Sequence, residues 1–276
     1  MTDLTAPFTY LFVPADRPER YAKALASGAD RVIIDLEDAV LDDNKSAGRT
    51  AIRQAIDITG IDWQRVVVRV NDVNSGHFEA DAALLREMSV RTVMIPKATS
   101  AATLQQVADA LGGDSHLLPQ IESVQGLFAM PELLARDDVA RLVFGHLDFA
   151  LDLGSGRDHE AMLYARSQIV LHSRFAGKAA PVDSVTPDFR DETACRLDAE
   201  AAHNLGFGGK LLIHPAQVAP VRGVFAPSES DLAWARRVIA AVEEGGRGAV
   251  AVDGQMVDKP VEEAARRMLL RSGQTD

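Results

Sequence analysis

Acidic and basic residues recur after the short apolar segments of this chain. They are Asp35, Glu37 and Asp38 after residues 31–34, Arg69 after 65–68, Lys97 after 92–95, Glu122 after 116–121, Asp148 after 141–144 and His214 after 210–213. Glu122 and Asp148 follow consecutive segments. Two carboxylates, completed by water and substrate oxygens, match the octahedral oxygen shell that Mg2+ prefers. The pattern therefore indicates metal-assisted chemistry, provided that the segments converge in space.

Eight short apolar segments are predicted to be β-strands. Most are rich in Val, Ile, Leu and Phe without polar alternation, as expected of parallel strands buried on both faces. They cover residues 10–13, 31–34, 65–68, 92–95, 116–121, 141–144, 180–182 and 210–213. Apolar residues at helical spacing predict helices over 18–26, 44–56, 78–88, 101–111, 125–136, 160–175 and 188–205. This alternation predicts a (β/α)8 TIM barrel, whose strand ends meet at one mouth.

A doubly wound sheet is the alternative fold for such a pattern. It normally has fewer strands and a glycine-rich first turn. The first turn here is Val13-Pro14-Ala15-Asp16-Arg17, which has no GxGxxG motif. The barrel is therefore the expected fold class.

Length and composition leave room for one barrel and an extension. The 276 residues divide into a barrel over 1–225 and a C-terminal extension over 226–276. The formal net charge of −11 argues against a nucleic acid or an anionic membrane as partner. The single Cys195 excludes an intramolecular disulfide, and neither a secretory signal nor a run of 18 apolar residues occurs. A cytoplasmic protein is expected.

The C-terminal extension has an apolar pattern of its own. An amphipathic helix is predicted over 231–244, a tight hairpin at Asp253-Gly254 and a last helix that ends near Leu270. We expect the extension to dock on its own barrel or on a neighbouring subunit.

Several candidate site residues also have a structural explanation. Asp148 taken singly is equally well explained as a helix N-cap. The acids of segment 35–38 would serve equally well by pairing with Arg69 or Lys97 as by binding a metal. Lys97 at a strand end is also the rival candidate for a Schiff base. The seven His residues lack paired spacing, so zinc is not expected, and His214 is expected to support the site by hydrogen bonding.

Taken together, the motifs resemble the citrate lyase β-subunit-like (HpcH/HpaI aldolase/citrate lyase) family, which includes malyl-CoA and citramalyl-CoA lyases. The motifs are LFVPADRPER at 11–20, DLEDAV at 35–40, RVN at 69–71, PK at 96–97, IES at 121–123, GHLD at 145–148, GK at 209–210 and IHPAQ at 213–217. They span nearly the whole chain in order. The segment GQMVDKP at 254–260 also resembles the family's tail.

The resemblance implies a Mg2+-dependent carbon–carbon lyase. Its substrate would be a 3-hydroxyacyl-CoA thioester such as citramalyl-CoA or malyl-CoA, and its products a 2-oxoacid and acetyl-CoA. By this resemblance Glu122 and Asp148 hold the metal, and Arg69, together with Glu122, binds the substrate. Asp258 would be the general acid or base and would reach a neighbouring subunit's site. A homo-oligomer, a trimer or hexamer, is therefore expected.

The candidate CoA contacts and the candidate acid in the C-terminal extension also have simpler structural explanations. Arg17, Arg20 and Lys23, at the first strand–helix junction, are candidate contacts for CoA phosphates, and the alternative is an ordinary solvated helix face. For Asp258 the alternative is the N-cap of the last helix, before Pro260.

One departure from the family pattern lies beside a proposed metal ligand. Many members have Gly-Ala-Glu-Asp where this chain has Gly145-His146-Leu147-Asp148, so Leu147 replaces an acid. The departure bears on the shape of the site and on the range of substrates.

Other functions compete with the CoA-thioester lyase. Within the class, a citrate lyase β subunit would act on a citryl thioester of an acyl carrier protein. From another class, a pyruvate-type phosphoryl-transfer barrel would need a phosphohistidine or nucleotide site, and no P-loop is present. A non-catalytic 2-oxoacid or CoA binder is the remaining alternative.

Overall fold

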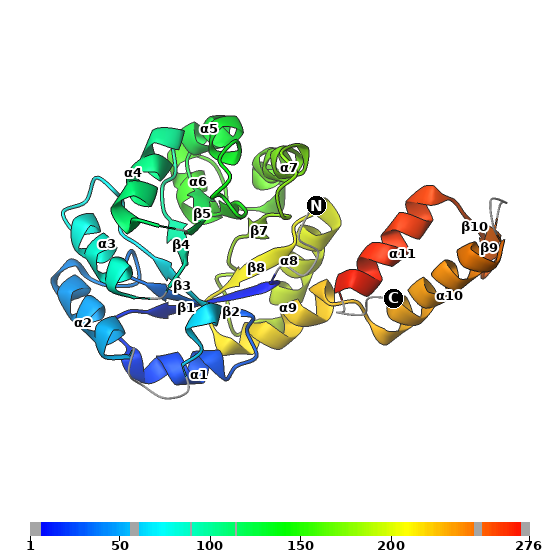
Figure 1. Ribbon diagram of the computed structural model, residues 1–276, viewed down its shortest axis with the longest axis horizontal. Coiled ribbons are helices and arrows are strands. Elements are labelled where there is room, and N and C mark those ends of the chain that lie inside the picture. Colours follow the sequence, from blue (N-terminus) through cyan, green and yellow to red (C-terminus); the bar gives the residue numbers. More distant parts are fainter. Residues whose placement is uncertain (1–6, 56–60, 89, 114, 246–249, 272–276) are drawn as a thin grey trace.

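A closed barrel of eight parallel strands forms most of the molecule (Figure 1). The computed structural model describes residues 7–55, 61–88, 90–113, 115–245 and 250–271. The strands are β1 Thr9–Pro14, β2 Arg31–Asp35, β3 Val66–Arg69, β4 Thr92–Ile95, β5 His116–Ile121, β6 Val143–Phe144, β7 Val182–Asp183 and β8 Gly209–Leu212. Each pairs with its sequence neighbours, and β1 closes the barrel on β8. The predicted (β/α)8 fold is confirmed.

Helices follow the strands around the outside of the barrel. They are α1 Tyr21–Leu25, α2 Lys45–Ala55, α3 Phe78–Glu87, α4 Ala101–Leu111, α5 Val124–Leu134, α6 His146–Leu153, α7 His159–Phe175, α8 Glu192–Leu205 and α9 Val218–Phe225. The predicted helix over 188–205 begins later, because Asp191 caps it by accepting a hydrogen bond from the Ala194 N–H. Neither α6 nor α9 was predicted, because eight residues carry too little periodicity to detect.

The interior of the barrel is built in layers of side chains. One apolar layer takes a single residue from each strand, namely Tyr10, Ile33, Val67, Met94, Leu118, Val143, Val182 and Leu211. Side chains along a strand alternate between its two faces, so the residue two positions later points into the same interior, nearer the mouth. That next layer is Phe12, Asp35, Arg69, Pro96, Gln120, Gly145, Ser184 and Ile213. The polar layer at the mouth of the barrel is thus packed directly above the apolar layer.

Asp30 ties the first strand to the last helix of the barrel. Its carboxylate accepts hydrogen bonds from the Phe8 N–H at 2.9 Å and from the Thr9 N–H at 3.0 Å, and it forms an ion pair with Arg222 of α9. Burial acts to raise the pKa of Asp30, but these hydrogen bonds and the Arg222 charge outweigh it and hold the pKa below its ordinary value. The charged form of Asp30 therefore stabilises barrel closure.

The C-terminal segment forms an arm that projects from the barrel (Figure 1). It consists of α10 Glu229–Gly245, the antiparallel pair β9 Val250–Val252 and β10 Gln255–Val257, and α11 Lys259–Arg271. The predicted hairpin turn is present, with Asp253 at φ 52° and Gly254 at φ 79°. Leu232, Ile239, Val252, Val257 and Leu269 belong to an apolar cluster separate from those of the barrel.

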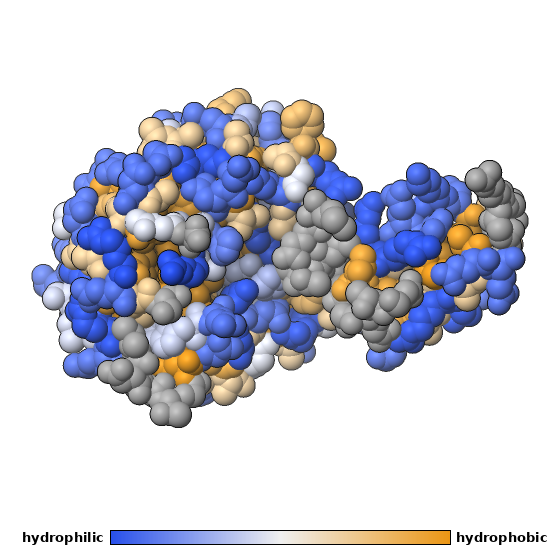
Figure 2. Space-filling view, viewed as in Figure 1, coloured by the Kyte–Doolittle hydropathy of each residue, from blue (hydrophilic) through white to orange (hydrophobic). Residues whose placement is uncertain are grey.

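The arm is amphipathic, and its apolar residues gather between α10 and α11 (Figure 2). It therefore packs on itself within one chain. Its expected contact with a neighbouring subunit stays a prediction. Among the described helices, none combines the length and hydrophobicity needed to cross a membrane.

Candidate active site

A buried ion pair between Arg69 and Asp35 lies at the mouth of the barrel. These are the last residues of β3 and β2 and are paired in register. Arg69 donates from Nε to Asp35 Oδ1 at 2.7 Å and from Nη2 to Oδ2 at 2.6 Å. Burial acts to lower the pKa of Arg69, but the charges of Asp35 and Glu37 outweigh it and raise the pKa. The guanidinium therefore stays charged, and it lies 4.8 Å from the centroid of the Phe12 ring.

The planar fork of Arg69 is thus occupied by a carboxylate of the protein itself. The remaining group, Nη1, lies 3.2 Å from Glu37 Oε2 and 3.5 Å from Gln120 Oε1. The second of these distances is at the limit of a hydrogen bond. Nη1 is therefore the one terminal nitrogen of Arg69 that is not bonded to Asp35, and Arg69 lines the cavity described below.

Glu37 and Lys97 form a second ion pair beside the first. Lys97 Nζ lies 2.8 Å from Glu37 Oε1. Burial acts to lower the pKa of Lys97, but its hydrogen bond to Glu37 and the Glu37 charge outweigh it and raise the pKa. A Schiff-base lysine needs a lowered pKa, so the environment of Lys97 does not favour that chemistry. Buried Lys45 stabilises the loop that follows β2, because it donates to the carbonyl oxygens of Leu36 at 2.9 Å and Glu37 at 2.8 Å.

Glu122 lies below the mouth, directly after β5, and is only 3% exposed. Its Oε1 accepts from the Lys97 N–H at 2.7 Å, and its Oε2 accepts from Gln120 Nε2 at 2.7 Å. Burial raises the pKa of Glu122 to about 8, against the lowering effects of Arg69 and the Lys97 N–H. Lys97 has a φ of 49°, an uncommon conformation for a residue with a side chain, and its N–H donates to Glu122.

Gly145 makes room for this carboxylate. A Cβ at Gly145 would come within 2.8 Å of both Gln120 Nε2 and Glu122 Oε2. Such distances would force the two side chains to move. Glycine at the end of β6 therefore preserves the orientation of Glu122.

Asp148 lies in the first turn of α6 and borders a cavity of about 320 Å³. Gly145, rather than Asp148, is the N-cap of this helix. Within the described residues, the Asp148 carboxylate has no hydrogen bond or ion pair to protein. The same cavity is lined by Arg69, Asp38 and Gln120 and by apolar side chains of several strands.

Glu122 and Asp148 fit a hard divalent cation such as Mg2+. Both supply oxygen donors, and the charge of Asp148 is one of the influences that raise the pKa of Glu122, so the two carboxylates interact. In the described ranges, no group of three or more His, Cys, Asp or Glu side chains is arranged to hold a metal. With two carboxylates as ligands, the other positions around Mg2+ would be filled by water and substrate, as in many Mg2+ sites.

The chain does not bring every predicted residue to this cavity. Asp258 is exposed on the arm, where its Oδ1 accepts from the Val261 N–H at 3.1 Å and caps α11. His214 accepts from the Ala216 N–H and stacks on Phe189 with centroids 4.7 Å apart, so it supports the loop after β8. Their proposed roles at the site stay predictions.

The candidate CoA contacts are exposed. Arg17 and Arg20 lie 3.9 Å from the carboxylates of Asp16 and Glu19, a long distance for an ion pair. Lys23 is exposed on α1. All three cations are accessible, and their contact with CoA stays a prediction.

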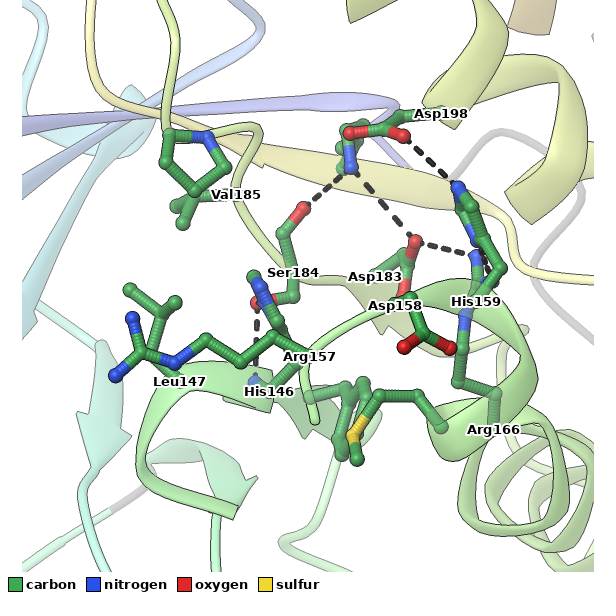
Figure 3. Close-up of a pocket in the computed structure, with 14 residues that line it drawn as sticks. His146, Leu147, Arg157, Asp158, His159, Arg166, Asp183, Ser184, Val185 and Asp198 are labelled. Carbon is green, nitrogen blue, oxygen red and sulfur yellow. Dashed lines mark hydrogen bonds and ion pairs between the residues drawn. The ribbon is translucent and has the colours of Figure 1, made fainter. Parts of the chain in front are cut away.

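A second cavity of about 270 Å³ (Figure 3) shares Leu147, Ser184 and Val185 with the first and so adjoins it. Two buried cations line this cavity, and both interact with Asp183. Arg166 Nη2 donates to Asp183 Oδ2 at 2.8 Å, and Lys210 Nζ lies 3.7 Å from the same atom. His146 Nδ1 lies 2.5 Å from Ser184 Oγ. Burial lowers the pKa of His146 to about 4, so its imidazole is neutral at pH 7.

Gln120 and Lys45 were missed by the sequence reasoning. Gln120 touches both Arg69 and Glu122. Its spacing of two from Glu122 on a strand was the available signal, because residues at this spacing share a face. Nothing in the sequence marks Lys45, whose burial depends on the packing of α2 against the loop.

Similarity to known proteins agrees with this geometry. The family model for HpcH/HpaI aldolase/citrate lyase matches residues 9–215. A citrate lyase subunit beta-like protein of Mycobacterium tuberculosis is 38% identical over 272 residues, which are 96% of this chain and 95% of the relative. A (3S)-malyl-CoA thioesterase of Cereibacter sphaeroides is 35% identical, with 96% and 95% covered.

Solved structures give the same result. The crystal structure of CitE from Mycobacterium tuberculosis in complex with magnesium, acetoacetate and coenzyme A has a TM-score of 0.84 and 37% identity, and the match covers 98% of this chain and 99% of that one. RipC from Yersinia pestis has a TM-score of 0.72 and 29% identity, with 83% and 100% covered. The chain therefore belongs to the HpcH/HpaI aldolase/citrate lyase family.

Proposed function

We propose that this protein is a Mg2+-dependent carbon–carbon lyase. It cleaves, or in reverse forms, a 3-hydroxyacyl-CoA thioester such as citramalyl-CoA or malyl-CoA, and the products are a 2-oxoacid and acetyl-CoA. The observation that carries the proposal is that Arg69 and Asp148 line one cavity at the barrel mouth and that the charges of both act on buried Glu122. The solved relative with magnesium, acetoacetate and coenzyme A supports the same ligand chemistry.

The proposed reaction is a retro-Claisen cleavage. The 3-hydroxyl loses its proton, the C2–C3 bond breaks, and the electron pair of that bond moves to C2 as a thioester enolate, which then takes up a proton. Glu122 and Asp148 would hold Mg2+, which supplies a Lewis acid for the oxygens at C3. Arg69 Nη1 binds the carboxylate, and its buried pairing with Asp35 and Glu37 keeps that cation in one orientation.

Asp258 is the proposed donor of the proton to C2. In condensation the same carboxylate would remove a proton from the acetyl thioester. In its own chain Asp258 caps α11 on the projecting arm, so the proposal requires the arm of a neighbouring copy. We therefore propose a homo-oligomer, a trimer or hexamer, with Arg17, Arg20 and Lys23 as contacts for CoA phosphates.

A product assay tests this function and its competitors. Purified protein is mixed with malyl-, citramalyl- and citryl-CoA, with and without Mg2+, and both the 2-oxoacid and the acetyl thioester are quantified by mass spectrometry. The lyase yields the two in equal amounts only with Mg2+. Free hydroxyacid and free CoA would instead indicate thioester hydrolysis, the activity named for the relative in Cereibacter sphaeroides.

The same assay separates the carriers. A citrate lyase subunit beta of Leuconostoc mesenteroides is 31% identical to this chain. Cleavage of citryl acyl-carrier protein, with no cleavage of any CoA thioester, would favour that alternative. Absence of all turnover, with retained binding of pyruvate, would favour a non-catalytic 2-oxoacid binder.

A further inference from the structure

The cavity at the mouth has a charged side and an apolar side. Leu147, Val185, Leu211 and Ile213 contribute apolar surface, together with Phe12. Arg69 is the one Lys or Arg among the described residues that line it. The lining therefore offers a single cationic side chain for a substrate carboxylate.

Lys97, Arg166 and Lys210 are paired with carboxylates, whereas Arg157 is exposed and lines the second cavity but not the first. Lys97 is held by Glu37 at 2.8 Å. Arg166 and Lys210 line the second cavity and share Asp183. Asp38 adds negative charge to the lining of the first cavity, whereas the Asp148 carboxylate is assigned to the metal. Within the first cavity, a second substrate carboxylate would thus meet either apolar surface or the negative charge of Asp38.

Leu147 lies where the two cavities adjoin. It is the second residue of α6, next to Asp148, and it lines both cavities together with Ser184 and Val185. In the close-up, Leu147 and Val185 lie on the same side of the second cavity, away from the Arg166–Asp183 pair (Figure 3). These side chains form an apolar partition beside the proposed metal ligand.

We infer that the partition of Leu147 and Val185 selects the substituent on the carbinol carbon of the substrate. It accepts hydrogen or a small alkyl group, such as methyl, and rejects carboxymethyl. The inference rests on the proposed function and narrows its substrates to malyl- and citramalyl-type thioesters, whose 2-oxoacid product has one carboxylate. A citryl thioester, which yields a dicarboxylate, is excluded.

The physical reason is the cost of removing a carboxylate from water without a cation. Burial of an unpaired charge is strongly unfavourable, whereas burial of a methyl group is favourable. One methyl or methylene in an apolar pocket changes kcat/KM by roughly tenfold or more. We expect kcat/KM for citramalyl-CoA to be higher than that for malyl-CoA by about this factor. It should be higher than that for citryl-CoA by roughly a hundredfold or more.

The test compares wild type with Leu147→Lys and with Leu151→Lys as a matched control. Leu151 lies on the same helix and is 75% exposed, so its substitution adds the same charge outside the cavity. The readout is kcat/KM for the three CoA thioesters with Mg2+. Leu147→Lys is expected to raise the citryl-to-citramalyl ratio by roughly tenfold or more, because it supplies the missing cation. Leu151→Lys should leave the ratio unchanged.

A binding experiment tests the inference even if the protein shows no turnover or the Leu147→Lys variant does not fold. Calorimetry with Mg2+ compares pyruvate and oxaloacetate on wild type and on Leu147→Ala. Wild type should bind pyruvate more tightly, and Leu147→Ala should reduce that preference. Equal binding of both acids by wild type overturns the inference, as does equal cleavage of citryl-CoA and citramalyl-CoA. Absence of lyase activity, with the pyruvate preference intact, overturns the proposed function alone.

Discussion

Arg69→Lys separates the structural role of Arg69 from its role in binding. Lysine keeps the positive charge but offers one ammonium in place of a fork. It would retain one bond to Asp35 and lose the second, together with the contact between Nη1 and Glu37. It would also leave no donor directed at the ligand. Stability and activity should therefore both fall, for different reasons.

The loss of stability can be worked out from these contacts. A hydrogen bond to a charged group contributes roughly 1.5–3 kcal/mol, and two such contacts are lost. Because lysine recovers part of this, we expect a loss of about 3 kcal/mol in the free energy of unfolding. For a chain of this size, that corresponds to a fall in Tm of roughly 6–12 °C.

The loss of activity follows from the missing donor. Removal of one charged hydrogen bond to the substrate carboxylate should lower kcat/KM by roughly 10- to 150-fold. The assays are thermal denaturation and Mg2+-dependent thioester cleavage below the melting range of the variant.

Arg141→Lys is the matched control. Arg141 is 3% exposed, precedes β6 at the opposite end of the barrel, and donates to the Pro7 carbonyl at 2.8 Å. The Arg141→Lys substitution should lower Tm and leave kcat/KM unchanged. Wild-type kcat/KM in Arg69→Lys would refute the assignment of the carboxylate site, and an unchanged Tm would refute the structural role of the ion-pair network.

Further predictions concern the metal, the tail and barrel closure. Glu122→Gln and Asp148→Asn should each abolish Mg2+-dependent turnover and leave circular dichroism intact, and unchanged metal affinity by calorimetry in both would contradict the proposed ligands. Asp258→Asn, which preserves a capping residue, should lower kcat by roughly 10²-fold with Mg2+ binding retained. Mixing these chains with Glu122→Gln chains should restore partial activity, and no recovery despite demonstrated subunit exchange would confine Asp258 to capping. Asp30→Asn should lower stability at pH 7, because the pKa of Asp30 is lowered on folding. This deficit should persist down to about pH 4 and shrink as the pH falls through the folded pKa, so a constant deficit in denaturant midpoints from pH 7 to pH 3 would argue against a charge effect.

The amino-acid sequence by itself determined the strands of the barrel and the position of the candidate residues at the strand ends. A strand covered on both faces needs an uninterrupted apolar segment, and a residue such as Arg69 or Glu122 that follows one must lie at a strand end. The hairpin at Asp253-Gly254 was also readable, because the turn needs two left-handed residues and this pair tolerates that conformation. These features depend on residues that are close together in the sequence, so they can be predicted from the sequence alone.

Only the tertiary structure decided which charges meet. Arg69 and Asp35 are separated by 34 residues, and Lys97 and Glu37 by 60, so their pairing depends on strand register and barrel closure. The occupied fork of Arg69, the left-handed Lys97 that donates to Glu122, and the space kept by Gly145 all follow from close approach between different strands. Spacing along the chain does not encode such approaches. The position of Asp258 on the arm is decided in the same way, because the arm packs its apolar face on itself and carries that carboxylate away from its own barrel.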